Sequence, residues 1–219
     1  MNKLLLTISL VLLTTFSFAQ NLTFGIKAGA NLSTIVFNGS TTNFIGTHQN
    51  ATGYQAGLTA DVGFQHFSVQ PELLFITKGS KYTEEYDYIT NSQNYVFRVA
   101  GTTKYKFLEL PVNVLYKLQA APGVRIYAGG GPYMDYGLSG TYTQDVTGSE
   151  TYDHHGEISF GNDQNKDDKR VNYGVNFMAG VELKKYFTID LNYGLGLTSV
   201  AWGISNKIRA LGLSAGYLF

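Results

Sequence analysis

The 219-residue sequence contains no cysteine, which excludes disulfide bonds, thiolate catalysis and cysteine-based metal sites. Charge is also scarce, because Asp, Glu, Lys and Arg make up 15% of the residues, against about 25% in soluble domains. The 16 basic and 16 acidic side chains cancel, so no net charge is available to attract nucleic acid. Proline is rare, whereas glycine, tyrosine and phenylalanine are abundant. This composition excludes several functional classes and favours β-structure.

The N-terminus has the pattern of a secretory signal peptide. A lysine near the start precedes an apolar stretch that begins at Leu4, and the small residues Ser17 and Ala19 fit a cleavage site. The apolar stretch is too short for a transmembrane helix. We therefore predict a cleaved signal over residues 1–19 and a single domain over residues 20–219, with secretion through the inner membrane.

The segment Leu22–Ser33 reads LTFGIKAGANLS and alternates strictly between apolar side chains and small or polar ones. This period of two predicts a β-strand with one apolar face. Comparable alternation recurs seven times, so we predict an all-β fold of eight antiparallel strands. The further segments cover residues 54–64, 67–76, 107–118, 124–138, 171–183, 187–198 and 210–219.

The connections between these segments also alternate, in length. Short turns follow the second, fourth and sixth strands, whereas long polar connections follow the first, third and fifth. Short turns at one end and long loops at the other are typical of an up-and-down transmembrane β-barrel. Residues 82–97 also alternate in places, which predicts a hairpin that extends two strands. The long connections cover residues 34–50, 79–104 and 139–170, and the short ones 65–66, 119–123 and 184–186.

The polar side of the strands indicates which way the barrel faces. A soluble, lipocalin-like barrel would turn this side to water and would carry many Lys and Glu residues there. Here the side is mostly Gly, Asn, Thr and Ser, which suits a narrow lumen, so the apolar side is predicted to contact lipid. Outward aromatic residues near both strand ends then fit two interfacial girdles. They are Phe24, Phe64, Phe67, Tyr116, Phe187, Tyr217 and Phe219 at one end, and Tyr54, Phe75, Tyr136 and Tyr173 at the other.

Charged residues on the inward side are predicted to pair with one another, because an isolated buried charge is costly. Eight strands enclose a space that side chains fill, so we expect a plugged lumen. A relay for protons or ions and a narrow conducting pore are the alternatives. The expected network contains Lys27, Asp61, Glu72, Arg125, Asp135 and Asp190.

Four cations belong to the lipid-facing side of the strands, near the strand ends that carry the long loops. There they could meet lipopolysaccharide phosphates. They are Lys104, Lys106, Lys207 and Arg209. The last strand ends in an aromatic residue, as in the C-terminal signal that barrel assembly machinery recognises. The outward residues of this predicted signal are Leu211, Leu213, Tyr217 and Phe219.

Neither catalysis nor a cofactor is expected from the polar motifs. His154 and His155 stand beside Asp153 and Glu157 and could bind a divalent metal, but a solvated loop is the simpler interpretation. Residues 162–170 are rich in Asp and Lys but lack the order of a calcium-binding loop. We therefore predict no metal site and no enzymatic activity.

The chain resembles the PorT-type outer-membrane β-barrel family of Bacteroidetes, in an OmpA-like eight-stranded form. The matching pieces are GIKAGANLS, VQPELLFITKGSK, FLELPVNVLYK, GGGPYMDYGL and LNYGLGLTSV. These motifs describe the construction of the barrel and carry no secretion role over, and we expect a structural or surface-interaction role through the long extracellular loops. Alternatives are a narrow channel, an accessory role in protein secretion or a lipid-modifying enzyme. Expected partners are membrane lipid, lipopolysaccharide, the assembly machinery and a surface or periplasmic protein, but no nucleic acid.

Overall fold

The computed structural model describes residues 21–37, 46–90, 93–148, 151–163, 165–202 and 206–219. The predicted signal peptide lies outside these residues. The ring strands are β1 (Asn21–Phe37), β2 (Gly46–Phe64), β3 (Phe67–Thr90), β4 (Gln93–Ala121), β5 (Val124–Gly148), β9 (Val171–Leu183), β10 (Phe187–Gly196) and β11 (Asn206–Leu218). The remaining strands are β6 (Tyr152–Ile158), β7 (Phe160–Gly161) and β8 (Asp168–Lys169).

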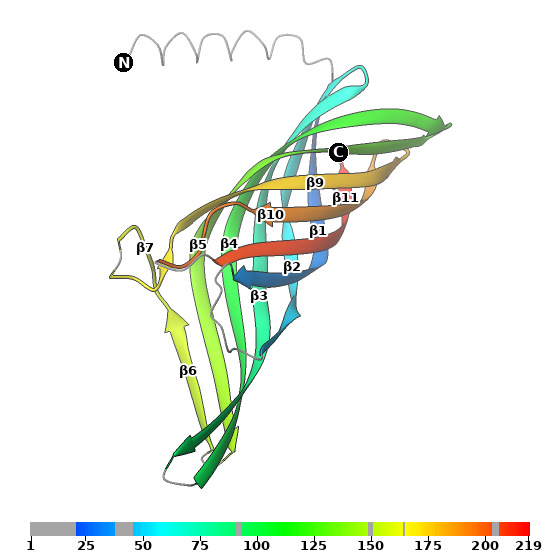
Figure 1. Ribbon diagram of the computed structural model, residues 1–219. Helices are drawn as coiled ribbons and strands as arrows, with labels where there is room; N and C mark the ends of the chain where they lie inside the picture. Colours follow the sequence, from blue (N-terminus) through cyan, green and yellow to red (C-terminus); the bar gives the residue numbers. More distant parts are fainter. Residues whose placement is uncertain (1–20, 38–45, 91–92, 149–150, 164, 203–205) are drawn as a thin grey trace.

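Eight strands form a closed antiparallel ring, as Figure 1 shows. Each strand pairs with its neighbour in the order β1, β2, β3, β4, β5, β9, β10 and β11. The ring closes where the first strand pairs with the last, with Ala28 opposite Ala215. This confirms the predicted all-β, eight-stranded, up-and-down barrel. The described residues include no helix long and apolar enough to cross a membrane.

The orientation of the side chains is the reverse of that in a soluble protein. In β1 the apolar Ile26 is 54% exposed, whereas the adjacent Lys27 is 4% exposed. The same alternation continues around the ring, with Leu213 at 58% and Ser214 at 2% in β11. The polar side of the strands therefore lines the interior, and the apolar side forms the outer surface. The lipocalin-like alternative, which needs an apolar core, is wrong.

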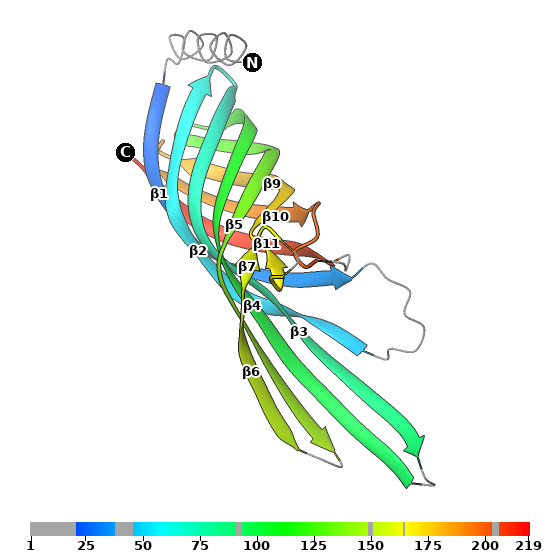
Figure 2. The same ribbon diagram turned by 90° about the vertical axis from the view of Figure 1, so that its left-hand side faces the viewer.

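Tight turns join the strands at one end of the barrel. Two residues connect Phe64 to Phe67, which lie opposite each other. The first of them, Gln65, has a positive φ of 50°, as the tight hairpin turns that match strand twist often require. Figure 2 shows that β1 begins and β11 ends at this same end.

The long connections at the other end are largely β-structure, which corrects their interpretation as loops. β3 and β4 remain paired as far as Thr90 and Gln93, so residues 79–90 and 93–104 form the two strands of a projecting hairpin. This confirms the extension predicted for residues 82–97. β5 continues to Gly148 and pairs with β6, so that much of residues 139–170 is strand as well. Figure 2 shows the two hairpins projecting together beyond the ring.

Inside the barrel, tyrosine rings pack over glycines of the neighbouring strand. Tyr133 of β5 lies opposite Gly174 of β9, and Tyr127 lies opposite Gly180. A Cβ atom at Gly174 would lie 2.3 Å from the Tyr133 ring, so only glycine leaves room for it. Glycine on the inward side thus lets large rings fill a narrow lumen.

Candidate functional site

The lumen holds three groups of ion pairs along its length. The group nearest the short turns centres on Lys117, whose Nζ lies 2.7 Å from Asp61 Oδ2 and 3.2 Å from Glu182 Oε2. Arg125 Nε donates a hydrogen bond of 3.0 Å to Glu182 Oε1. Ser68 adds a hydrogen bond of 3.2 Å to Asp61. Two cations and two carboxylates therefore compensate one another here.

The middle group centres on Lys27 of β1. Its Nζ lies 2.6 Å from Glu72 Oε1 and 3.3 Å from Asp190 Oδ1. The Tyr127 hydroxyl lies 3.5 Å from the other Asp190 oxygen. The three charged side chains are almost fully buried. A single lysine therefore links carboxylates on two strands that lie on opposite sides of β1 in the ring.

The third group lies nearest the projecting hairpins and centres on Lys78. Its Nζ lies 2.8 Å from Asp135 Oδ2 and also pairs with Glu109. The two carboxylates stand opposite each other on β4 and β5. The Lys78 ammonium also lies 4.6 Å from the Tyr133 ring centroid, within the range of a cation–π contact. This lysine separates two carboxylates that would otherwise repel each other.

The structure divides the predicted lumen residues among these groups instead of placing them in one. Arg125 and Asp61 are in the lowest group, Lys27, Glu72 and Asp190 in the middle one, and Asp135 in the third. The sequence prediction omitted four partners, although their inward parity was a usable signal. They are Lys78, Glu109, Lys117 and Glu182.

Above the third group, an apolar cluster crosses the lumen. Strand residues meet two side chains that come from connections, Phe160 after β6 and Val200 after β10. The Phe107 and Phe160 rings lie 6.0 Å apart in an edge-on arrangement. We call this set the apolar cap. It consists of Ile35, Ile76, Tyr105, Phe107, Phe160, Val200 and Ile208.

Polar contacts hold the two connections of the apolar cap in place. The Asp167 carboxylate accepts hydrogen bonds of 2.8 Å from the Ser159 backbone N–H and hydroxyl, which lowers the pKa of Asp167. Burial raises the pKa of Asp168, although a hydrogen bond from Tyr105 opposes this. Lys169 lies 5.1 Å from the Trp202 ring centroid. Asp167, Asp168 and Lys169 thus make ordered contacts beside the apolar cap, so they are not simply part of a solvated turn.

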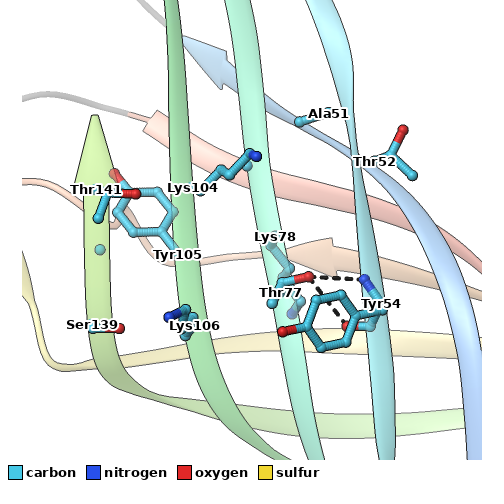
Figure 3. A pocket seen from close by; sticks show the side chains of 12 residues that line it. Ala51, Thr52, Tyr54, Thr77, Lys78, Lys104, Tyr105, Lys106, Ser139 and Thr141 are labelled. Carbon is cyan, nitrogen blue, oxygen red and sulfur yellow. Dashed lines mark hydrogen bonds between the residues drawn. The ribbon is translucent and has the colours of Figure 1, made fainter. Parts of the chain in front are cut away.

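The outward cations occupy two separate places on the barrel. Lys104 and Lys106 lie on β4, whereas Lys207 and Arg209 lie on β11, with β1, β2 and β3 between them. The β4 pair borders an outer hollow of about 180 Å³, shown in Figure 3. We call it the outer basic hollow. Its outward-facing lining includes Tyr54, Thr77, Lys104, Lys106, Ser139 and Thr141.

The predicted aromatic girdles and C-terminal residues lie on the outer surface. At the short-turn end, the rings of Phe67 and Tyr116 lie 5.0 Å apart, and those of Phe187 and Tyr217 lie 5.2 Å apart. At the other end, Tyr54 and Phe75 lie 6.0 Å apart. The four side chains of the predicted assembly signal all point outward. They are Leu211, Leu213, Tyr217 and Phe219.

The adjacent histidines lie in strand β6, which corrects their placement in a loop. Neighbouring residues of a strand point to opposite faces, so His154 and His155 cannot bind one metal ion together. His154 Nε2 instead lies 3.0 Å from the Tyr142 hydroxyl. Within the part of the chain that the structure describes, no three His, Asp or Glu side chains are grouped to hold a metal ion.

Comparisons with known proteins agree with the barrel architecture. The family model for an outer membrane protein beta-barrel domain matches residues 18–201. Comparison with curated protein sequences gives no match. Among solved structures, Ail of Yersinia pestis, in complex with the heparin analogue sucrose octasulfate, has 14% identity and a TM-score of 0.42 over 91% of this chain and all of its own.

Two further solved structures have similar values. Neisserial surface protein A has 14% identity and a TM-score of 0.40, over 91% of this chain and 98% of its own. OprG of Pseudomonas aeruginosa has 12% identity and a TM-score of 0.40, over 90% of this chain and 95% of its own. These likenesses carry no assignment of their own, and the PorT-type assignment stays a prediction. The family match covers most of the chain, and the chain belongs to the outer membrane protein beta-barrel domain family, an assignment that places it in the outer membrane.

Proposed function

We propose that the protein is a non-catalytic outer-membrane barrel whose lumen is closed and whose projecting hairpins bind a partner at the cell surface. The observation that carries this proposal is the projection itself. β3 and β4 pair for 12 further register positions beyond Lys78 and Tyr105, from Gly79 opposite Lys104 to the last recorded pair at Thr90 and Gln93. A sheet of this length beyond the membrane is not needed to close the barrel.

The contents of the lumen support a closed barrel. Three ion-pair groups and the apolar cap succeed one another from the short turns to the projecting hairpins. Large rings, among them Tyr127, Tyr133 and Phe107, are buried between them. An eight-stranded barrel has little space beyond that of its own side chains. We therefore infer that ions do not pass freely.

A narrow channel is the second candidate, and one observation favours it. Several buried polar atoms in the lumen have no hydrogen-bond partner among the described residues, including atoms of Asn31, Gln55, Asn113 and Asn192. Buried polar groups of this kind are usually satisfied by water. Hydrated pockets joined through the lumen would provide a path for small solutes.

Planar-bilayer recording separates these two functions. The purified full-length protein, inserted into a bilayer in symmetrical salt, is expected to give no stable unitary openings. A variant that removes two large cap rings, Phe107→Ala with Phe160→Ala, serves as the positive control for access to the lumen. Stable openings of the unmodified protein would favour the channel.

The surface role is tested by shortening the projection. Replacing residues 83–100 with Asn-Gly joins Tyr82 to Gly101, which lie opposite each other, through a tight turn. A second variant replaces residues 142–156 with Asn-Gly, joining Thr141 to its partner Glu157. Crosslinking on whole cells followed by mass spectrometry should recover a partner with the full chain only. Recovery of the same partners with both shortened variants would contradict the surface role.

A further inference from the structure

The outer basic hollow lies where the outer surface changes from apolar to polar. From the short turns toward the projecting hairpins, the outward side of β4 is apolar until it reaches the first cation, Lys106. The apolar residues are Tyr116, Val114, Val112, Leu110 and Leu108. The adjoining strands change at the same level. In the same direction, the outward side changes from Phe75 to Thr77 on β3 and from Tyr54 to Thr52 on β2. On β5 it changes from Leu138 to Ser139.

Irregularities in the neighbouring strands shape this hollow. The register between β2 and β3 shifts between Asn50 and Gln55, and the Thr77 hydroxyl accepts a hydrogen bond of 2.8 Å from the Tyr54 backbone N–H. The register between β4 and β5 shifts beside Lys106. At that shift, Leu138 and Ser139 are both exposed although they are adjacent. β-Bulges of this kind redirect side chains, and here they place hydroxyl groups around two lysines.

The cations of this region are free to bind a ligand. Among the described residues, the ammonium groups of Lys104, Lys106 and Lys81 have no ion-pair or hydrogen-bond partner. Lys104 lies opposite Gly79, which has no side chain to obstruct it. Figure 3 shows the Lys104 side chain extending from β4 over β3. A second hollow, of about 350 Å³, continues from Lys104 to Lys81.

We infer that the outer basic hollow binds the phosphate group of a phosphorylated glycolipid in the outer leaflet, while the acyl chains lie along the apolar belt below. The ammonium groups of Lys104 and Lys106 supply charge at the level of lipid headgroups. The hydroxyls of Ser139 and Thr141 can donate hydrogen bonds to phosphate oxygens, and charge-assisted bonds are stronger than neutral ones. A ligand with both an anionic head and an apolar body fits both surfaces. This inference rests on the barrel's place in the membrane and not on the proposed surface role.

The β11 pair provides a matched control within the same chain. Lys207 and Arg209 also point outward near the upper strand ends, but they lie outside the outer basic hollow. If any outward cation at this level were enough to bind the glycolipid, removing either pair would weaken binding equally. The inference predicts that they differ.

The test measures binding of bisphosphorylated lipid A to the full-length protein refolded in lipid-free detergent, by calorimetry and native mass spectrometry. Lys104→Gln with Lys106→Gln should weaken binding by about tenfold or more, because two charge-assisted contacts are lost. Lys207→Gln with Arg209→Gln should change it less than about threefold. Circular dichroism and thermal melting check that every variant folds.

Two further arms identify the source of the phosphate. Dephosphorylated lipid A should bind at least about tenfold more weakly than the bisphosphorylated form. Inorganic phosphate at millimolar concentration should not displace the lipid. The inference is overturned if the β4 variant binds as the unmodified protein does, if both variant pairs lose affinity equally, or if inorganic phosphate competes effectively.

Discussion

At the scale of single residues, each buried lysine of the lumen serves two carboxylates. Lys27, Lys78 and Lys117 each contact acidic side chains from two different strands. Removing one member of a buried ion pair leaves an uncompensated charge, which costs far more than the pair itself contributes. The stability of the barrel therefore depends on these three ammonium groups.

Lys78→Met should lower the free energy of unfolding by about 3–5 kcal/mol, because Glu109 and Asp135 then face each other without a cation. Urea unfolding of the protein in detergent micelles measures this. Lys106→Met is the matched control, because it removes a lysine at the same level of the barrel that points outward. Lys106 lies opposite Thr77, which is adjacent to Lys78. The control should change the stability by no more than about 0.5 kcal/mol. Equal losses would show that the Lys78 group does not stabilise the barrel.

The apolar cap should respond to pH through Asp168. Because burial raises its pKa above the ordinary value, the ionised carboxylate opposes the closed cap. This destabilisation begins above the unfolded-state pKa of about 3.9 and is complete above the raised pKa, so acidification through that window should tighten the cap. Trp202, the only tryptophan of the chain, reports on it through fluorescence quenching. In Asp168→Asn the quenching should no longer depend on pH over this window; an unchanged profile would point to another group.

The inward parity of the strands was sufficient to predict many of the lumen residues, but not all of them. Lys27 and Asp190 lie in the middle of clearly alternating strands, so alternation placed them correctly on the inner side. Lys78 was missed because it lies where the strand was expected to end. Its partners could not be assigned either, because pairing across the lumen depends on strand register and tilt, which one sequence does not reveal.

At the scale of strands and connections, alternation predicted the ring but not the cap. Residues 67–76 and 107–118 keep a period of two, and their inward and outward sides are as expected. Phe160 and Val200 belong to connections without such a period, so nothing in the sequence marks them as buried. The projecting hairpins were underestimated, because outside the membrane both faces of a strand can be polar and the apolar signal disappears.

The last strand allows a prediction about assembly. Phe219 is 67% exposed, and its backbone N–H donates a hydrogen bond of 2.7 Å to Phe24 O that does not need the ring. Phe219→Ser should therefore leave the stability of the refolded barrel within about 0.5 kcal/mol of the original value. In cells, the same variant should reduce the amount inserted in the outer membrane severalfold, measured by membrane fractionation. Normal insertion would show that the terminal ring is not part of an assembly signal.

At the scale of the whole molecule, the barrel reverses the usual distribution of side chains. The three ion-pair groups and the buried amide side chains are inside, and large apolar residues cover the outer surface of the ring. Such an outer surface is stable only against hydrocarbon, since a contiguous apolar area of this extent would otherwise drive association. The closed lumen, the projecting sheet and the lipid site all depend on this orientation.

Site-directed spin labelling tests that orientation most directly, because the chain has no cysteine of its own. Single cysteines replace Lys104, Leu110, Val112 and Val114 along the outward side of β4, and the protein is reconstituted into lipid vesicles. Labels at positions 110, 112 and 114 should be relaxed by oxygen, which dissolves in hydrocarbon, and not by a water-soluble nickel chelate. The label at position 104 should respond to the chelate. Strong relaxation by the chelate at positions 110, 112 and 114, or no access by either reagent, would contradict contact with the membrane interior.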